Sequence, residues 1–285
     1  MKMFMALLGV VVSAMAQYRW TIFDQEHLKL CSDSYTCGGR QHTMCYQPNV
    51  THARCQRFAP IVLGEENIKS FMMGHNGLRN KVATNPRLPA TNMQFLHWDQ
   101  DLQAMAERWV RQCNVGYDEC DFIGNPAHPI GQNVFFHPKP PLKHWEALAL
   151  SSWFNEKRKL GNDFTVGSLR KEDTSNYTQL VWATTQFVGC GAAEMFGGHL
   201  VVCYYYPRGN IPGQPVYRVG HRPCVGCPQE RASCSHVFRG LCGIDDRHSG
   251  GRPVGANAWP SFTVAIALLA LTGELTKLIT SCERW

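Results

Sequence analysis

The chain has 285 residues, a formal net charge of +6 and 13 cysteines; 44% of its residues are hydrophobic and 18% are charged. This hydrophobic fraction is enough to build a core, which excludes a generally disordered chain. The positive charge is mild and spread out, without a lysine/arginine block or a nucleic-acid motif, so a nucleic-acid partner is not expected. Thirteen cysteines favour an oxidising compartment, and the odd number leaves at least one outside any internal disulfide.

The N-terminus has the layout of a secretory signal peptide. Lys2 supplies the positive charge, residues 3–12 are apolar, and residues 14–16 (Ala-Met-Ala) fit the small-x-small cleavage site. A short buried helix is the alternative interpretation of this stretch. Cleavage there would remove residues 1–16 and leave Gln17 as the first residue of the mature chain.

Composition divides the remaining chain into four regions. Residues 17–63 hold four cysteines and show little periodicity, which indicates a disulfide-stapled N-terminal extension. Residues 64–212 are patterned and form the expected main domain. Residues 213–249 are rich in Pro, Gly and Cys and are typical of a cysteine-rich hinge-like segment, whereas residues 250–285 combine a linker with an apolar tail.

Three helices and a short strand are expected in the first part of the main domain. Apolar residues recur at helical spacing in 65–83, in 99–113, where Asp99 is the expected N-cap, and in 143–159. Between the last two helices, residues 134–136 (Val-Phe-Phe) predict a strand that ends at a proline-rich stretch.

A β-hairpin is expected at the end of the main domain. Residues 187–193 and 200–206 have the composition of two strands around a Gly-Gly turn at 197–198. Cys190 and Cys203 lie nearly symmetrically about that turn, as a cross-strand disulfide would. Helices mixed with a mostly antiparallel sheet predict an α+β layered domain.

Two titratable residues lie on faces that are otherwise apolar. His75 follows the buried stripe of the first helix, and Glu156 falls on the same face as the tryptophans of the third. One interpretation is a structural hydrogen-bond pair that holds two helices to the sheet, and the other is a polar cluster at the floor of a cleft. Neither a Gly-x-Ser-x-Gly nor a His-Glu-x-x-His motif occurs in the chain.

Two other local patterns point to covalent modification. Cys224 and Cys227 form a Cys-x-x-Cys pair, for which zinc or redox chemistry is an alternative, but further cysteines nearby in a secreted chain favour disulfides. Asn49 and Asn176 each begin a glycosylation sequon. We expect Asn49, in the loop-rich extension, to be used, whereas Asn176 falls inside the patterned domain.

Five motifs in order resemble those of the CAP superfamily, which contains cysteine-rich secretory proteins, insect venom allergens of the antigen 5 group and plant pathogenesis-related proteins. They are His75-Asn76-Gly77-Leu78-Arg79, Gly131-Gln132-Asn133-Val134, Trp153-Phe154-Asn155-Glu156, Asn176-Tyr177-Thr178-Gln179-Leu180-Val181-Trp182 and Val201-Val202-Cys203-Tyr204-Tyr205-Tyr206-Pro207-Arg208-Gly209-Asn210. The resemblance covers about residues 27–212. Residues 37–45 are similar to the N-terminal extension of insect antigen 5 proteins.

The resemblance implies a three-layer α–β–α sandwich, with the sheet between helical layers. It also implies two local disulfides among Cys224, Cys227, Cys234 and Cys242, as in the short hinge of cysteine-rich secretory proteins. The disulfide pairs implied for the extension and main domain are Cys31 with Cys45, Cys37 with Cys120, Cys55 with Cys113, and Cys190 with Cys203.

The family's central cleft carries two histidines and two acidic residues, and the resemblance assigns those positions to His75, Gln132, Glu156 and Asn176. Two of the four are neutral amides here. One histidine and one carboxylate make a poor zinc site and a weak acid–base pair. We therefore expect no metal, no cofactor and no catalytic residue in the cleft, and no stoichiometric zinc binding at neutral pH.

The C-terminal tail has the layout of a GPI-anchor signal. Small residues at 249–251 precede a polar spacer at 252–260 and an apolar stretch at 261–272, although charged residues follow. A weak membrane anchor and a soluble tail are the alternatives, since the apolar run is shorter than a membrane span. The thirteenth cysteine, Cys282, lies in this segment, so tail removal would account for the odd count.

These observations predict an extracellular, non-enzymatic CAP-domain protein. The resemblance implies binding of a lipid, sterol or small amphiphile, and a venom or salivary allergen in an arthropod setting. The main alternative is an interaction or toxin protein that acts on a host receptor, channel or haemostatic factor through loops such as 121–142. A metal-dependent hydrolase or protease is the third hypothesis, weakened by the two amides in the cleft.

Overall fold

Two long antiparallel strands, β6 (Phe187–Met195) and β7 (Gly198–Tyr206), lie at the centre of the sheet. Cys190 lies directly opposite Cys203 in their register, and a disulfide joins them with Cα atoms 4.0 Å apart. The hairpin is therefore confirmed, but its two-residue turn is Phe196-Gly197, both with positive φ, rather than the Gly-Gly pair.

The computed structural model describes residues 31, 37–123, 125–139, 143–160 and 175–243. Residues 1–16, which are expected to be a signal peptide, and the chain beyond residue 243, with the expected apolar tail and Cys282, lie outside the described residues. Within them, no helix is long and apolar enough to cross a membrane.

The main sheet has five strands. β1 (Ala59–Ile61), β6, β7 and β5 (Gly131–His137) follow one another in antiparallel order, and the short β2 (His97–Trp98) pairs in parallel with β6. β3 (Phe122–Ile123) and β4 (Asn125–Pro129) form a separate two-stranded sheet beside the start of β5.

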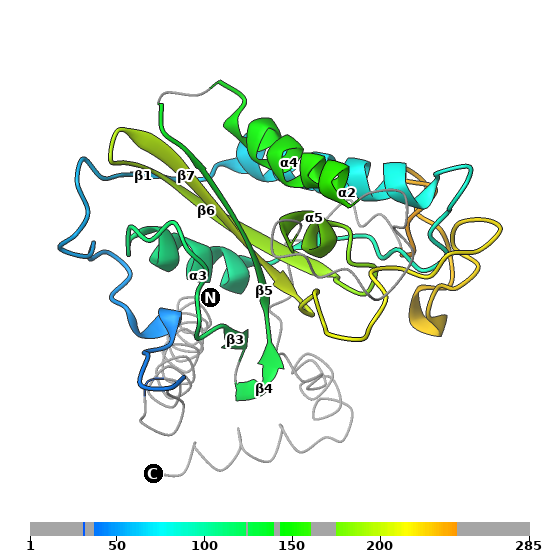
Figure 1. Ribbon diagram of the computed structural model, residues 1–285, viewed down its shortest axis with the longest axis horizontal. Coiled ribbons are helices and arrows are strands. Elements are labelled where there is room, and N and C mark those ends of the chain that lie inside the picture. Colours follow the sequence, from blue (N-terminus) through cyan, green and yellow to red (C-terminus); the bar gives the residue numbers. More distant parts are fainter. Residues whose placement is uncertain (1–30, 32–36, 124, 140–142, 161–174, 244–285) are drawn as a thin grey trace, which may run out of the picture. The chain divides into compact units, whose positions relative to one another are not determined.

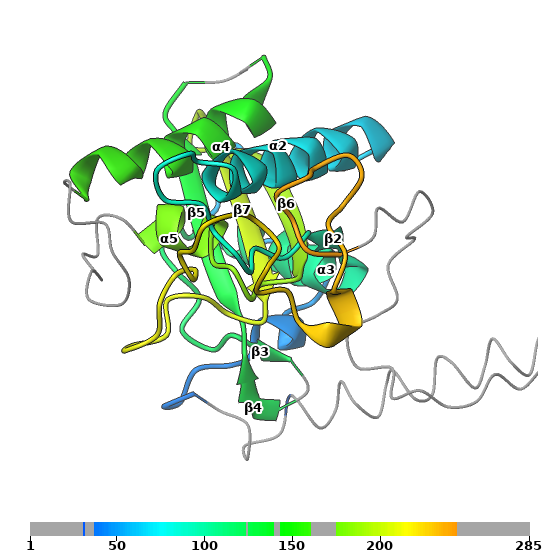
Figure 2. The same ribbon diagram turned by 90° about the vertical axis from the view of Figure 1, so that its right-hand side faces the viewer.

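Helices cover both faces of the sheet, as Figures 1 and 2 show, so the expected three-layer α–β–α sandwich is confirmed. α2 (Glu65–Ala83) and α4 (Trp145–Asn155) lie on one face and α3 (Gln100–Val110) on the other. Side chains of β7 alternate between the two cores: Cys203 and Tyr205 belong to the α2/α4 side, whereas Val202 and Tyr204 belong to the α3 side.

The three helices begin close to where the sequence places them. Asp99 caps α3 by accepting a hydrogen bond from Leu102 N at 2.9 Å. α3 lies so close to the sheet that a Cβ on Gly189 of β6 would fall 2.2 Å from the backbone nitrogen of Gln103. α4 ends at Asn155 and continues as one 3₁₀ turn, Glu156–Lys159. A short helix that the sequence analysis missed, α5 (Ser175–Leu180), lies beside β5.

Six disulfides are formed among the described cysteines, and the four in the extension and main domain are the pairs that the resemblance implies. The two in the cysteine-rich segment are local. The pairs are Cys31–Cys45, Cys37–Cys120, Cys55–Cys113, Cys190–Cys203, Cys224–Cys234 and Cys227–Cys242.

The cysteine-rich segment packs against the main domain. Cys242 N donates to Met93 O at 2.7 Å and Phe95 N donates to Cys242 O at 2.9 Å. Leu241 is fully buried, and Gly240 N donates to Asn80 Oδ1 of α2 at 2.8 Å. The described part of this segment is therefore held to the fold by main-chain hydrogen bonds as well as by its disulfides.

Candidate functional site

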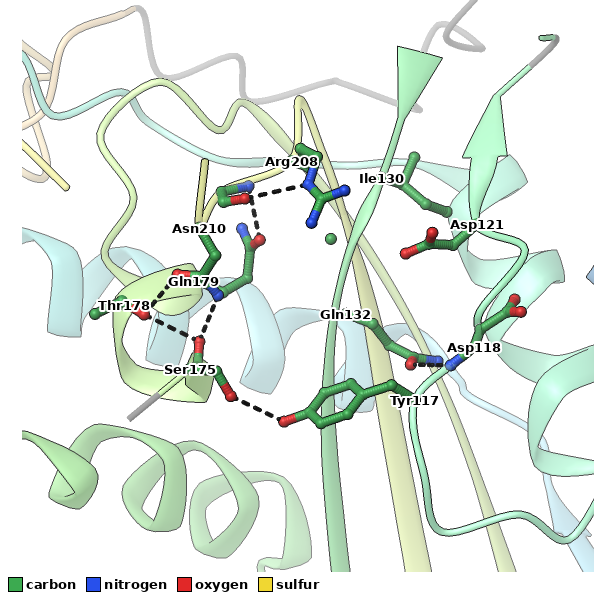
Figure 3. Close-up of a pocket in the computed structure, with 12 residues that line it drawn as sticks. Tyr117, Asp118, Asp121, Ile130, Gln132, Ser175, Thr178, Gln179, Arg208 and Asn210 are labelled. Atoms are coloured by element: carbon green, nitrogen blue, oxygen red, sulfur yellow. Dashed lines mark hydrogen bonds between the residues drawn. The ribbon is translucent and has the colours of Figure 1, made fainter. Parts of the chain in front are cut away.

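A cavity of about 750 Å³ lies beside the start of the edge strand β5 (Figure 3). Three other segments line it: the loop between α3 and β3, the helix α5, and the loop that follows β7. The lining residues are Tyr117, Asp118, Asp121, Ile130, Gly131, Gln132, Ser175, Thr178, Gln179, Arg208, Gly209 and Asn210. Most of these side chains are polar, and they come from parts of the chain that are far apart in sequence.

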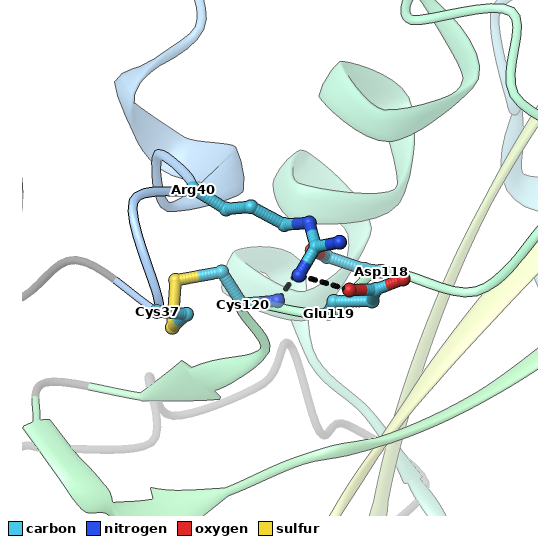
Figure 4. A network of polar contacts seen from close by, with 5 residues as sticks. All are labelled: Cys37, Arg40, Asp118, Glu119 and Cys120. Atoms are coloured by element: carbon cyan, nitrogen blue, oxygen red, sulfur yellow. Dashed lines mark hydrogen bonds and ion pairs between the residues drawn. A yellow bond between two sulfur atoms is a disulfide. The ribbon is translucent and has the colours of Figure 1, made fainter.

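The N-terminal extension holds the α3–β3 loop in place. Three successive loop residues each contact the extension: the Asp118 carboxylate accepts a hydrogen bond from Thr43 Oγ1, Glu119 pairs with Arg40, and Cys120 is bonded to Cys37 (Figure 4). Asp118 also accepts hydrogen bonds from Tyr204 OH at 2.8 Å and from Cys120 N at 2.9 Å. Its negative charge is thus fully hydrogen-bonded at the cavity wall.

The opposite wall depends on Gln179 of α5. Its Oε1 accepts a hydrogen bond from Gly209 N at 2.7 Å, which ties the loop after β7 to the helix. A Cβ on Gly131 would lie 1.9 Å from the same oxygen, so a larger residue on β5 would displace the Gln179 amide and its hydrogen bond to Gly209. Thr178 and Asn210 add a side-chain hydrogen bond of 2.6 Å between the same two segments.

Two opposite charges face the cavity from its two sides. Arg208 and Asp121 both line it, yet no ion pair joins them in the described part of the chain. Burial and, to a smaller extent, the nearby Asp118 carboxylate raise the pKa of the Asp121 carboxyl, Arg208 partly offsets them, and the result is about 7. Asp121 therefore changes its charge near neutral pH.

Three of the four predicted cleft residues lie in or next to this cavity. Gln132 lines it and accepts a hydrogen bond from Asp118 N at 2.7 Å. Glu156 accepts hydrogen bonds from Asn176 Nδ2 at 2.7 Å and from Tyr177 N at 2.9 Å, and Asn176 Oδ1 accepts one from Tyr117 OH at 3.1 Å. The amide of Asn176 thus joins Glu156 to the cavity wall.

His75 does not line the cavity, which corrects the sequence-based assignment. It is fully buried under the α2/α4 face, where Nδ1 donates to Phe71 O at 2.8 Å and Nε2 accepts from Tyr205 OH at 2.9 Å. Burial lowers the pKa of His75 to about 4, so the ring is neutral. Gln132 pairs with Tyr204 and belongs to the other face of the sheet, so β-strand alternation keeps it apart from His75.

A hydrogen-bonded chain nevertheless links His75 to the predicted residues. Tyr205 OH accepts a hydrogen bond from Asn133 Nδ2 at 3.2 Å, and the same amide donates to Asn176 O at 2.9 Å. This arrangement matches the structural interpretation of His75, a buried group that joins a helix to the sheet. Tyr117, and not His75, lies beside Asn176 at the cavity. No spacing or motif in the sequence predicted Tyr117 as a site residue.

The motif that contains His75 is used to hold the fold. Asn76 exchanges two hydrogen bonds with the backbone of Leu96, at 3.0 and 2.9 Å. Arg79 is fully buried and donates to five backbone carbonyls, two of which also accept a second donor. The five carbonyls belong to Gln94, Leu180, Trp182, Ala183 and Thr185.

The predicted cleft residues near the cavity make a poor zinc site. Gln132 and Asn176 offer neutral amides, and both Glu156 oxygens already accept hydrogen bonds. Among the described residues, the sulfur atoms of Cys224, Cys227 and Cys242 lie within 4.8 Å of one another, but each cysteine is in a disulfide and offers no thiolate.

The two sequons differ in accessibility. Asn49 is exposed in a turn of the extension. Asn176 is half-buried, and its Nδ2 atom, the point of glycan attachment, donates to Glu156. In the folded chain a glycan on Asn176 would have to displace that contact.

The sandwich, its motifs and its disulfides together define a CAP fold. The model of the cysteine-rich secretory protein family (CAP) matches residues 73–205, and the chain belongs to this family. It is 32% identical to venom allergen 5 of Brachyponera chinensis over 204 residues, which cover 64% of this chain and 100% of that protein. It is 30% identical to a cysteine-rich venom protein of Tityus serrulatus over 239 residues, 78% of this chain and 56% of that protein.

Solved structures show the same fold. The hookworm platelet inhibitor superposes with a TM-score of 0.54 at 24% identity, over 69% of this chain and 98% of that one. NaASP2, solved with Zn²⁺, superposes with a TM-score of 0.54 at 24% identity, over 64% of this chain and 97% of that one.

Proposed function

We propose that this chain is a secreted, non-enzymatic binding protein that holds a small amphiphile in the cavity beside β5. The single observation that supports this function is the cavity itself. Its volume of about 750 Å³ is within the range of small-molecule sites, and four segments of the fold build it. Nine of its twelve lining residues have polar side chains, yet more of the surface that they expose is apolar than polar, so the cavity suits a ligand with both a polar head group and an apolar part.

The side chains at the cavity support binding rather than catalysis. Ser175 Oγ, a hydroxyl that could act as a nucleophile, contacts Tyr117 OH at 3.1 Å, and among the described lining residues no histidine stands next to it as a base. The relatives named venom allergen 5 support an arthropod venom or salivary setting, in which the protein would be an allergen. A GPI anchor in the C-terminal tail remains part of the proposal.

The test is extraction of a bound molecule from protein made in insect cells. We expect organic solvent to release one amphiphile per chain, detected by mass spectrometry. Ser175→Trp should fill the cavity and reduce the bound amount at least tenfold. Ser151→Trp, at an exposed position of α4, is the matched control and should leave it unchanged. Protein that carries no small molecule, or equal loading of both variants, would contradict the proposal.

A further inference from the structure

Arg208 and Asp121 place opposite charges on the two sides of the cavity. Figure 3 shows them flanking the start of β5, Arg208 from the loop after β7 and Asp121 from the loop after α3. Arg208 Nε makes one long hydrogen bond, 3.4 Å, to Gly209 O. Within the described residues, its two terminal nitrogens have no hydrogen-bond acceptor and no ion-pair partner, so its planar donor fork is available to a ligand.

Asp121 offers the complementary group. The charged and titratable side chains that act on it are Asp118 from the same loop, Arg208, and Tyr204 of β7. Asp118 is saturated by donors, whereas the described residues provide no side-chain donor to the Asp121 carboxylate. With its pKa near 7, Asp121 is poised to ionise fully when a positive charge arrives.

A third group on the wall has an unused donor. Gln132 is only 8% exposed and lines the cavity. Its Oε1 is fixed on Asp118 N, which sets the orientation of the amide, and its Nε2 has no acceptor among the described residues. Buried amide donors are almost always paired, and this nitrogen itself has almost no accessible surface, so a ligand oxygen would reach it through a small shift of the Gln132 side chain and would then remove an energetic penalty.

We propose that the cavity binds the zwitterionic head group of a small amphiphile, its anionic group on Arg208 and Gln132 and its ammonium on Asp121. The assignment rests on the proposed function and names its ligand class. An anionic head group would meet the repulsion of Asp118 and Asp121, and a cationic one that of Arg208. A neutral head group would leave both charges unpaired inside the cavity. Only a ligand with both charges satisfies both sides.

The test uses four probes with the same hexyl chain, each monomeric in solution: hexylphosphocholine, hexyl phosphate, hexyltrimethylammonium and hexyl glucoside. By calorimetry we expect hexylphosphocholine to bind at least tenfold more tightly than each of the others. Arg208→Gln and Asp121→Asn should each remove that preference. Lys69→Gln and Glu66→Gln, which remove the same charges from exposed positions of α2, should keep it.

Proton release separates the two halves of the assignment. At pH 7, binding of the ammonium group should ionise Asp121 and release a fraction of a proton per ligand, because burial raises the pKa of that carboxyl to about 7. Potentiometric titration in unbuffered sodium chloride, where no buffer anion competes for Arg208, measures this quantity. Asp121→Asn should show no release, and proton uptake by the wild type would overturn the assignment.

The outcomes distinguish this assignment from the proposed function. Equal affinity for all four probes would overturn the zwitterionic head group and leave amphiphile binding intact. If hexyl phosphate or hexyltrimethylammonium binds more tightly than hexylphosphocholine, the zwitterionic assignment is wrong and the cavity selects a head group with that single kind of charge. Absence of binding by all four would overturn the head-group assignment and amphiphile binding in the cavity together.

Discussion

Replacing Arg79 with Met should destabilise the fold by several kcal/mol. The side chain is fully buried, and its five carbonyl acceptors lie at the end of α5, in the loop that follows it, and at Gln94 in the loop before β2. Burial lowers the pKa of Arg79 to about 9, but five carbonyl dipoles around the guanidinium keep it charged at neutral pH. Met fills a similar volume without any donor, so the variant isolates the hydrogen bonds.

The magnitude follows from the acceptors that lose their donor. Trp182 O also accepts from Thr185 N, and Ala183 O also accepts from Gln94 N. The carbonyls of Gln94, Leu180 and Thr185 have no second donor among the described residues. At about 1–2 kcal/mol for each orphaned carbonyl, the loss is about 3–6 kcal/mol, a large part of the 5–15 kcal/mol typical of a folded domain.

The assay is urea unfolding with all disulfides intact, followed by tryptophan fluorescence. Arg79→Lys is the informative companion, because it keeps the charge but concentrates its three donors on one nitrogen and should lose less than Arg79→Met. The melting temperature should fall by about 6–24 °C for Arg79→Met, given about 2–4 °C per kcal/mol for a domain of this size. Arg79→Met within 1 kcal/mol of the wild type would refute the argument that these hydrogen bonds hold the loops.

Three further predictions concern stability and modification. Cys190→Ala with Cys203→Ala should cost about 3 kcal/mol in urea unfolding, because the disulfide closes a loop with a sequence separation of 13; a loss below 1 kcal/mol would contradict the loop-entropy estimate. Neutral His75 must charge on unfolding, so the difference in unfolding free energy between the wild type and His75→Gln should be constant above pH 6.5 and fall by about 3 kcal/mol as pH drops to 4; Asp121, whose pKa is raised, gives both proteins the same opposite slope, and a difference independent of pH would refute the cause. Peptide mass spectrometry should find a glycan on Asn49 and none on Asn176, and the reverse occupancy would contradict the accessibility argument.

The parts of the fold that the sequence predicts best are those with a long hydrophobic period. The helix over 65–83 agrees with α2 residue for residue, because nineteen residues give five turns of an apolar stripe. The hairpin was predictable because two cysteines had to face each other across it. By contrast, α5 has six residues and β2 has two, too few for any period to emerge.

The candidate site was harder to predict from the sequence. A polar residue on an apolar helix stripe is expected to be buried, but the helical spacing does not specify which face of the sheet the helix packs against. His75 and Glu156 both stood out in this way, and both proved to be structural hydrogen-bond partners. The direction of Gln132 depends on the register of β5 against β7, which a single sequence does not specify. One residue of register separates the cavity face from the face that buries His75.

The cavity also depends on parts of the chain that sequence patterns describe least. Tyr117, Asp121 and Arg208 lie in loops. Contacts with the extension hold the loop of Tyr117 and Asp121, and hydrogen bonds to α5 hold the loop of Arg208. Three consecutive loop residues contact the extension through a hydrogen bond, an ion pair and a disulfide. The disulfide-stapled extension therefore restricts the conformation of a polar loop. A hydrophobic core cannot do this for the loop, because its side chains are polar and are well solvated by water. Changes in the extension should for this reason alter ligand binding at a cavity that the extension does not itself line.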